Sequence, residues 1–149
     1  MGELTLRERA LRHLARRDHS RAELARKLSA YGSADEIEAV LARMGELELQ
    51  SDTRFAEAWV RSKAARFGGT RLRSELLRRG VDKTLINETI ANECVESELD
   101  RARAVWQSRF RTPPADSREW ARQARFLQTR GFATDVICKL LKENPDESA

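Results

Sequence analysis

The stretch Thr70-Arg71-Leu72-Arg73-Ser74-Glu75-Leu76-Leu77-Arg78-Arg79-Gly80 decides how this chain folds, because related stretches occur three times. Leu72 and Leu76 are four residues apart and place one apolar face of a helix against a core, and Gly80 follows where a helix ends. Similar stretches precede Gly32 and Gly131, so the three glycines are 48 and 51 residues apart. A repeat of this length predicts that copies of one helical unit stack side by side.

Each unit carries apolar residues at matching positions before and after its glycine. At the glycine itself we expect a left-handed turn. No segment shows sustained strand alternation. We therefore predict an all-α fold of three tandem three-helix repeats, stacked into an elongated, curved array. The expected boundaries are 1–50, 51–97 and 98–149, and the last repeat ends in a short acidic tail. The equivalent core positions are Leu28, Leu76 and Leu127, then Ile37, Ile86 and Ile137, then Leu41, Ile90 and Leu141.

Helix start signals agree with these divisions. Ser20 with Glu23, and Ser33 with Glu36, have the spacing of a capping box, in which each side chain binds the other residue's backbone N–H. Asp82 is expected to cap the third helix of the second repeat, and Thr134 that of the third repeat.

Composition excludes several protein classes. The 149 residues are 35% charged and 40% hydrophobic, with a net charge of +4, which suits a folded chain better than a disordered one. No apolar run reaches the roughly 18–20 residues of a membrane helix, and the N-terminus lacks the order of a signal peptide. Cys94 and Cys138 fall in apolar helical patterns, so we expect reduced thiols in a cytoplasmic protein rather than a disulfide. Two Cys and two His without ligand spacing predict no metal site.

The charge alternates along the repeat. In every unit the first two helices are basic and the third is acidic. One interpretation is that alternating charge keeps a helical array soluble and pairs neighbouring helices, although exposed ion pairs contribute only about 0–1 kcal/mol each. The other is that stacking aligns the basic helices into a stripe that attracts a phosphate backbone or an acidic protein groove. The net charges are +4 for 1–34, −5 for 35–52, +6 for 54–83, −5 for 84–100, +6 for 101–130 and −2 for 131–149.

The densest basic segment is interrupted by Phe67-Gly68-Gly69. A Gly-Gly pair permits a tight bend and lets backbone N–H groups approach a phosphate. Phe67 could stack on a base, but an aromatic residue in this setting more often belongs to the core. We expect the remaining aromatic residues of the third unit to pack between repeats, namely Trp106, Phe110, Trp120 and Phe126.

No constellation of residues predicts catalysis. Asp18-His19-Ser20 contains the residue types of a nucleophilic triad, but a triad needs side chains that converge from separate elements. An interhelical loop with Ser20 as helix cap explains the tripeptide better. We predict that the protein is not an enzyme and needs no cofactor.

The second repeat resembles a known signature. Asp52-Thr53-Arg54-Phe55-Ala56-Glu57-Ala58-Trp59-Val60, then Arg66-Phe67-Gly68-Gly69-Thr70-Arg71-Leu72-Arg73-Ser74-Glu75-Leu76 and Arg79-Gly80-Val81, resemble the central motif of the bacterial regulatory RecX family. The resemblance extends over essentially the whole chain, including Gly131-Phe132 followed by Ile137. Gly69-Thr70 departs from the family, which commonly has Gly-Pro or a similar turn there.

The resemblance implies a non-enzymatic modulator of the RecA recombinase, which binds the groove of the RecA–single-stranded DNA filament and inhibits strand exchange, ATP hydrolysis and coprotease activity. It implies RecA and, weakly and salt-dependently, single-stranded DNA as partners; we expect a monomer that binds no membrane. A general helical DNA-binding protein and a protein-only helical scaffold are the alternatives. The basic residues that match the motif, and the candidate contacts, are Arg54, Arg66, Arg71, Arg73, Arg78 and Arg79.

Overall fold

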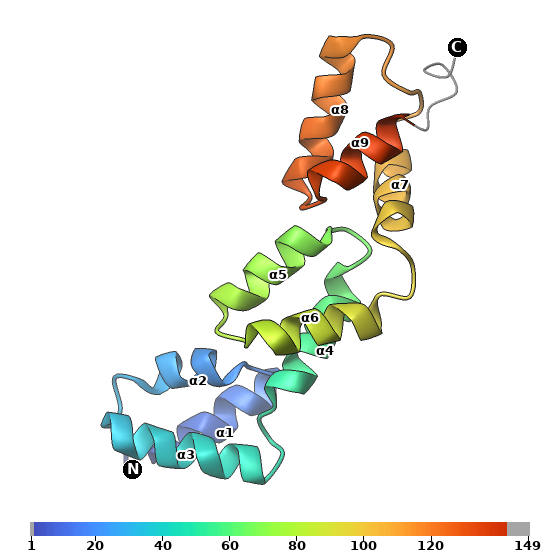
Figure 1. Ribbon diagram of the computed structural model, residues 1–149. Coiled ribbons are helices and arrows are strands. Elements are labelled where there is room, and N and C mark those ends of the chain that lie inside the picture. The colour runs from blue at the N-terminus through green and yellow to red at the C-terminus, as the bar shows by residue number, and fades with distance from the viewer. Residues whose placement is uncertain (1, 143–149) are drawn as a thin grey trace. The chain divides into compact units, whose positions relative to one another are not determined.

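A computed structural model describes residues 2–142 of the chain, and all the regular structure in this range is α-helical (Figure 1). The first repeat contributes α1 (Leu6–Arg16), α2 (Arg21–Leu28) and α3 (Ala34–Glu46). The second contributes α4 (Asp52–Lys63), α5 (Gly69–Arg78) and α6 (Lys83–Glu93), and the third α7 (Glu98–Arg109), α8 (Ser117–Thr129) and α9 (Thr134–Lys142). The predicted all-α fold of three three-helix repeats is confirmed. The predicted acidic tail lies outside the described residues.

The helix starts follow the sequence signals closely. Ser20 and Ser33 both form complete capping boxes, as predicted. The Asp82 carboxylate accepts hydrogen bonds from the backbone N–H groups of Thr84 and Leu85, so its capping role is confirmed too. The prediction for Thr134 is wrong, because α9 begins at Thr134 itself and Ala133 supplies the first carbonyl.

Two of the three glycine turns adopt the predicted left-handed conformation. Gly80 has φ 82° and Gly131 has φ 90°, and the residue after each glycine donates its N–H to a carbonyl five positions back. This arrangement closes a helix by satisfying its last carbonyls. Gly32 is different: it is not among the residues with positive φ, because α2 already ends at Leu28 and turns through Ser29. The left-handed turn predicted at Gly32 is therefore wrong.

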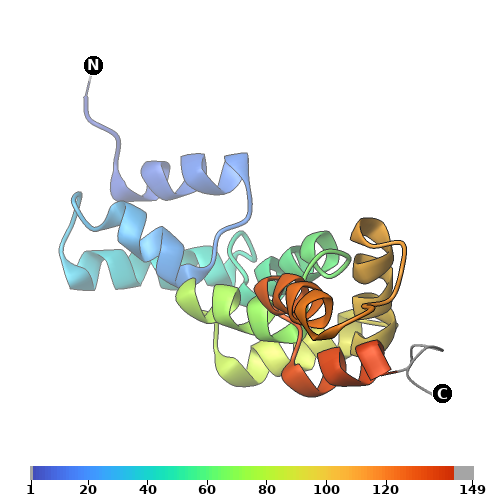
Figure 2. The same cartoon turned by 90° about the horizontal axis from the view of Figure 1, so that it is seen from above.

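The three repeat leucines occupy equivalent buried positions. Leu28, Leu76 and Leu127 are each 0% exposed, as predicted. Figure 2 shows α1, α2 and α3 lying side by side, as in Figure 1, and their core is built from Leu24, Leu28, Ile37, Leu41 and Met44. The third repeat repeats this plan with Val105, Leu127, Phe132, Ile137 and Leu141.

The described chain divides into two compact units that cut through the second repeat. One unit comprises Met1–Trp59 with Leu76–Thr89, and the other comprises Val60–Glu75 with Ile90–Ala149. Each therefore combines an end repeat with part of the middle one. The middle repeat serves as the partner of both its neighbours.

The aromatic residues of the third repeat pack on one another and on the core of that repeat. Trp106, Trp120 and Phe126 pack on the core of their own repeat, and the Phe110 and Phe126 rings meet edge to face at 5.3 Å. A three-helix unit of this size needs large side chains to fill its own centre. These residues therefore help to fill the third repeat itself, and packing between repeats stays a prediction.

Candidate functional site

The second helices of the first and second repeats begin against the glycine turn of the following repeat, and Arg79 and Arg71 of the sequence motif lie at these two junctions. In one unit the Ser20 hydroxyl, at the start of α2, donates to the Arg79 carbonyl at 2.6 Å. In the other, the Gly68 N–H, at the start of α5, donates to the Arg130 carbonyl at 2.8 Å. Arg79 and Arg130 each precede the left-handed glycine. The same junction is therefore built twice from different residues.

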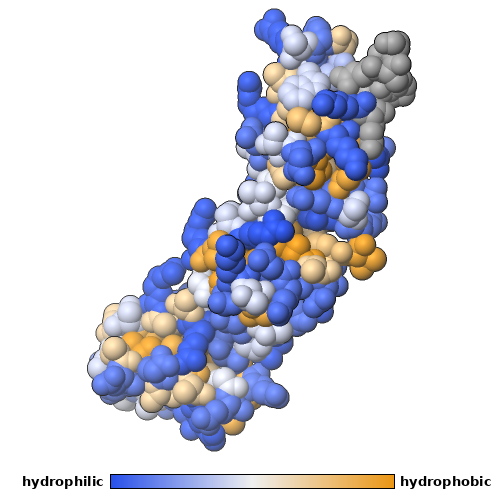
Figure 3. Space-filling model, viewed as in Figure 1, coloured by the Kyte–Doolittle hydropathy of each residue, from blue (hydrophilic) through white to orange (hydrophobic). Residues whose placement is uncertain are grey.

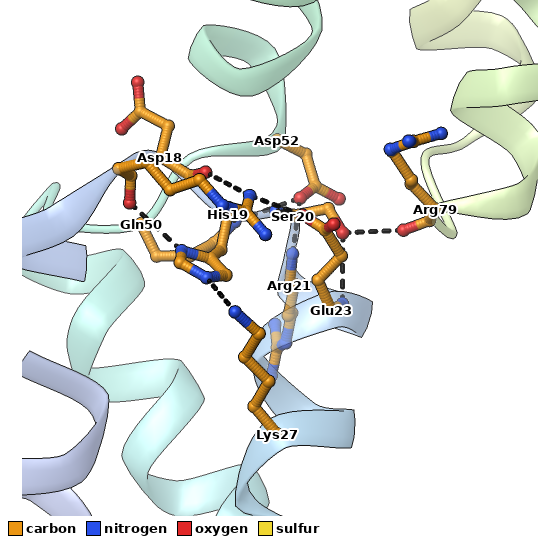
Figure 4. A network of polar contacts seen from close by, with 10 residues as sticks. Asp18, His19, Ser20, Arg21, Glu23, Lys27, Gln50, Asp52 and Arg79 are labelled. Atoms are coloured by element: carbon orange, nitrogen blue, oxygen red, sulfur yellow. Dashed lines mark hydrogen bonds and ion pairs between the residues drawn. The ribbon is translucent and has the colours of Figure 1, made fainter. Parts of the chain in front are cut away.

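The junction network of the first unit is drawn in Figure 4. The buried His19 ring is held at Nδ1 by the Arg17 carbonyl, 3.0 Å away, and its Nε2 lies 3.0 Å from Lys27 Nζ. The Asp52 carboxylate accepts the Arg21 N–H at 2.8 Å and the Gln50 side-chain amide at 3.0 Å. Polar groups of this junction are thus paired with the chain itself.

The surroundings of His19 in this network lower its pKa. Burial lowers the pKa of His19, and the nearby Arg17 and Lys27 charges lower it further, against the opposing effect of the Arg17 carbonyl. Burial would raise the pKa of Glu23, but the Ser20 backbone N–H and the Arg17 guanidinium outweigh it and lower that pKa. A neutral imidazole can accept a hydrogen bond from the Lys27 ammonium at Nε2 while its Nδ1–H donates to the Arg17 carbonyl.

Arg71 is half-buried in α5 and makes three internal contacts. Its guanidinium donates to the Thr129 carbonyl at 3.2 Å and lies 3.7 Å from the Glu75 carboxylate. It also lies 3.9 Å from the centre of the Phe67 ring. Arg71 therefore anchors the second repeat to the glycine turn of the third, which the sequence did not indicate.

Arg66 and Arg71 are brought together by one aromatic ring. The exposed Arg66 guanidinium lies 5.4 Å from the centre of Phe67, the ring that Arg71 also covers. Phe67 is half-buried, so the expected core position is only partly realised. Two guanidinium groups on one ring form a small cationic surface.

Arg79 and Arg54 lie in the other unit and face different partners. The Arg79 guanidinium covers the Trp59 ring at 3.9 Å. Arg54 donates to the carbonyls of Glu48 and Leu49 at 3.0 and 3.1 Å and pairs with Asp18 at 3.3 Å. Glu48 has φ 59°, a left-handed conformation that costs an ordinary residue about 1–2 kcal/mol. Arg54 thus stabilises the loop that ends α3.

Arg73 and Arg78 are exposed on α5. The Arg78 side chain forms no hydrogen bond, ion pair or ring contact with any described residue, so its charge is available to a partner. Of the six predicted contacts, Arg54, Arg66, Arg73 and Arg78 are exposed, whereas Arg71 and Arg79 are half-buried.

The Gly68-Gly69 bend serves the fold. The Gly68 N–H donates to the Arg130 carbonyl, and the Gly69 N–H donates to the Glu98 carboxylate at 2.9 Å. A side chain at Gly68 would come within 2.5–2.7 Å of the Gly131–Phe132 backbone. The interpretation that these N–H groups approach a phosphate is therefore wrong, because both are occupied within the protein.

Sequence reasoning missed Arg101, which is 8% exposed. Its guanidinium donates to the carbonyls of Ala64 and Phe67, just beyond α4. Arg101 lies 47 residues after Arg54, and each arginine reaches from the first helix of its repeat to the first interhelical loop of the preceding one, at Phe67 and Asp18. The spacing of the two arginines is close to the length of one repeat, and this is the signal that could have revealed their shared role.

The rest of the described surface offers little else that resembles a reactive site. Hydrophilic side chains cover most of the face shown in Figure 3, and apolar ones gather in small groups. Among residues 2–142, no three His, Cys, Asp or Glu side chains cluster to hold a metal ion, and no helix is long and apolar enough to cross a membrane.

Comparisons with known proteins cover nearly the whole chain. Models of the first, second and third three-helix domains of RecX match residues 7–44, 51–90 and 96–141. Regulatory protein RecX of Leptothrix cholodnii is 45% identical over 141 residues, covering 94% of this chain and 89% of that protein. Regulatory protein RecX of Ralstonia nicotianae is 44% identical, covering 93% and 87%.

Solved structures agree in fold. The crystal structure of RecX from Lactobacillus salivarius superposes with a TM-score of 0.78 at 21% identity, covering 93% of both chains. A second crystal structure of regulatory protein RecX gives a TM-score of 0.79 at 20% identity, covering 93% of this chain and 72% of that one. With three matching domains and close relatives along nearly its whole length, the chain belongs to the RecX family.

Proposed function

We propose that this protein binds the filament that RecA forms on single-stranded DNA and inhibits the recombinase, ATPase and coprotease activities of RecA. The observation that carries the proposal is membership of the RecX family, whose relatives here are named regulatory proteins. The protein acts by binding, as a monomer in the cytoplasm, without a cofactor.

The exposed arginines of the second repeat are the proposed contacts with the filament. Arg66, Arg73 and Arg78 are exposed, and a filament of protein and DNA offers both phosphates and acidic side chains. Guanidinium groups bind carboxylate and phosphate in the same two-pronged geometry. Arg71 also contacts the Thr129 carbonyl and the Phe67 ring, so its replacement would disturb a junction, and it is left out of the test below.

The test is RecA ATP hydrolysis on single-stranded DNA, titrated with the wild type and with the double variant Arg73→Glu, Arg78→Glu. The matched control is Arg7→Glu, Arg12→Glu, which makes the same −4 change in charge on exposed positions of α1. We expect the wild type and the control to inhibit, and the α5 variant to need at least about tenfold more protein, as for paired interface charges. No inhibition by the wild type refutes the function, and equal inhibition by all three refutes this contact surface.

The same experiment separates the alternatives. A general DNA-binding protein would slow ATP hydrolysis only by competing for DNA, so excess DNA would restore the rate. A protein-only scaffold would leave the rate unchanged. Inhibition that persists when single-stranded DNA is in excess over RecA supports binding to the filament itself.

A further inference from the structure

The third repeat carries a second cationic surface, separate from the residues of the sequence motif. Arg118, Arg122 and Arg125 in α8 are spaced four and three residues apart, so they lie along one face of the helix. All three are exposed. We call the surface formed by Arg109, Arg118, Arg122, Arg125 and Arg130 the α8 arginine surface.

An aromatic pair gathers part of this surface. The Phe110 and Phe126 rings contact edge to face, and the Arg122 guanidinium lies 5.3 Å from the Phe110 centre. Arg109 and Arg130 both approach Phe126, at 5.8 and 5.0 Å. Three arginines from α7, α8 and the turn after α8 are thus positioned around two rings, of which Phe126 is half-buried.

The fold neutralises little of this charge. Glu119 is the one acidic residue within α8, and it pairs with Arg122 at 3.0 Å and accepts from the Gln123 amide. The side chains of Arg118 and Arg125 form no ion pair or hydrogen bond with any described residue. Like charges at this helical spacing destabilise a helix by about 0.2–0.5 kcal/mol per pair. The surface therefore costs the protein stability, and an external anion would offset that cost.

We propose that the α8 arginine surface binds single-stranded nucleic acid through its phosphates and stacks a base on Phe126. Arginines held against a ring at an exposed site lose only about 0.5–1 kcal/mol when they turn away. They can therefore contact a phosphate while a base takes their place on the ring. In duplex DNA the faces of the bases are stacked on one another, and an acidic protein has no bases. The ring therefore favours a single strand, whose bases are free to stack on it.

This inference deepens the proposed function by assigning DNA contact to the third repeat, but its test does not involve RecA. Binding of the isolated full-length protein to a fluorescein-labelled oligo-dT is followed by anisotropy at several salt concentrations. The variant is Arg118→Glu, Arg125→Glu, and the control is again Arg7→Glu, Arg12→Glu. Circular dichroism first checks that each variant keeps its helix content.

We expect the α8 variant to bind oligo-dT at least about tenfold more weakly than the control. Two lost phosphate contacts should flatten the slope of log K against log salt by about 1.4. Equal losses in both variants would mean that only the total charge matters, and would overturn the proposal. The filament proposal is judged separately by ATPase inhibition, so either can fail alone.

The stacking step has its own variants. Phe126→Leu keeps apolar volume but removes the aromatic face, and Phe126→Tyr keeps that face. We expect Phe126→Leu to weaken oligo-dT binding about fivefold or more and Phe126→Tyr to bind as the wild type does. Unchanged binding by Phe126→Leu, or equal weakening of oligo-dT, duplex DNA and poly-glutamate by the α8 variant, overturns the assignment to a single strand.

Discussion

Replacing Gly131 by alanine should break the junction between α8 and the start of α5. Gly131 has φ 90°, a conformation that costs a residue with a side chain about 1–2 kcal/mol. The new Cβ would lie 2.7 Å from Arg71 N and 2.9 Å from Arg71 Cα, and both atoms belong to backbone that cannot swing aside. The neighbouring chain must therefore move.

The size of the effect follows from the bonds that this movement breaks. Gly68 N–H donates to the Arg130 carbonyl at 2.8 Å, and Thr70 N–H donates to the Gly131 carbonyl at 3.1 Å. Each such bond contributes about 0.5–1.5 kcal/mol. With the backbone strain, Gly131→Ala should lower the free energy of unfolding by about 2–5 kcal/mol.

The measurement is urea unfolding followed by circular dichroism at 222 nm. The matched control is Gly45→Ala in α3, where no atom lies within 4 Å of the new Cβ. A helical glycine is about 0.5–1 kcal/mol less favourable than alanine, so the control should be slightly more stable than the wild type. Gly80→Ala, at φ 82° and against the Ala22 side chain, should resemble Gly131→Ala. A loss below about 1 kcal/mol at both junction glycines would refute the reasoning.

Three further outcomes test other parts of the fold. Leu76→Asp places a charge at a site that is 0% exposed, so the cooperative thermal transition seen by circular dichroism should be lost or lowered by well over 10 °C. Stability should fall as the pH drops below the ordinary histidine pKa of about 6.5. The reason is that His19 has a lowered pKa in the folded protein, so the unfolded chain binds a proton there more readily than the folded chain does. His19→Gln should therefore make the free energy of unfolding, measured by urea titration, less dependent on pH. Arg101→Ala should cost about 2–4 kcal/mol in the same titrations, and Arg54→Ala clearly less, because the Arg101 side chain is buried and donates to part-buried carbonyls, whereas Arg54 is exposed.

Local signals in the sequence predicted the interior of each repeat well. Leu28, Leu76 and Leu127 are buried because helical spacing alone assigns them to one face, and Ser20 and Ser33 cap helices because their partners lie three residues away. The left-handed turns at Gly80 and Gly131 were also predictable from local sequence, because each glycine comes just after the end of its helix. The prediction for Gly32 is wrong because α2 ends earlier, through an ordinary turn that needs no glycine.

The junctions could not be predicted in the same way. Ser20 meets Arg79 across 59 residues, and Arg71 meets Thr129 across 58, and no short-range pattern encodes such pairs. Gly68 therefore looked like a flexible bend open to a phosphate, although its close approach to Gly131 leaves no room for a side chain. A glycine demanded by a distant backbone has the same appearance in sequence as one demanded by a ligand.

The arginines show how the fold divides one residue type between structure and binding. Arg101 satisfies carbonyls beyond α4, and Arg54 satisfies carbonyls beyond α3, so both are used by the chain itself. A carbonyl carries no formal charge, so it does not neutralise the guanidinium. The hydrogen bonds nevertheless fix the side chain in place and make its rearrangement toward a partner costly. Arg78, Arg118 and Arg125 have no such hold among the described residues, and their full charge faces solvent. Position relative to the junctions, rather than basic density along the chain, therefore decides which of these arginine side chains the fold itself uses.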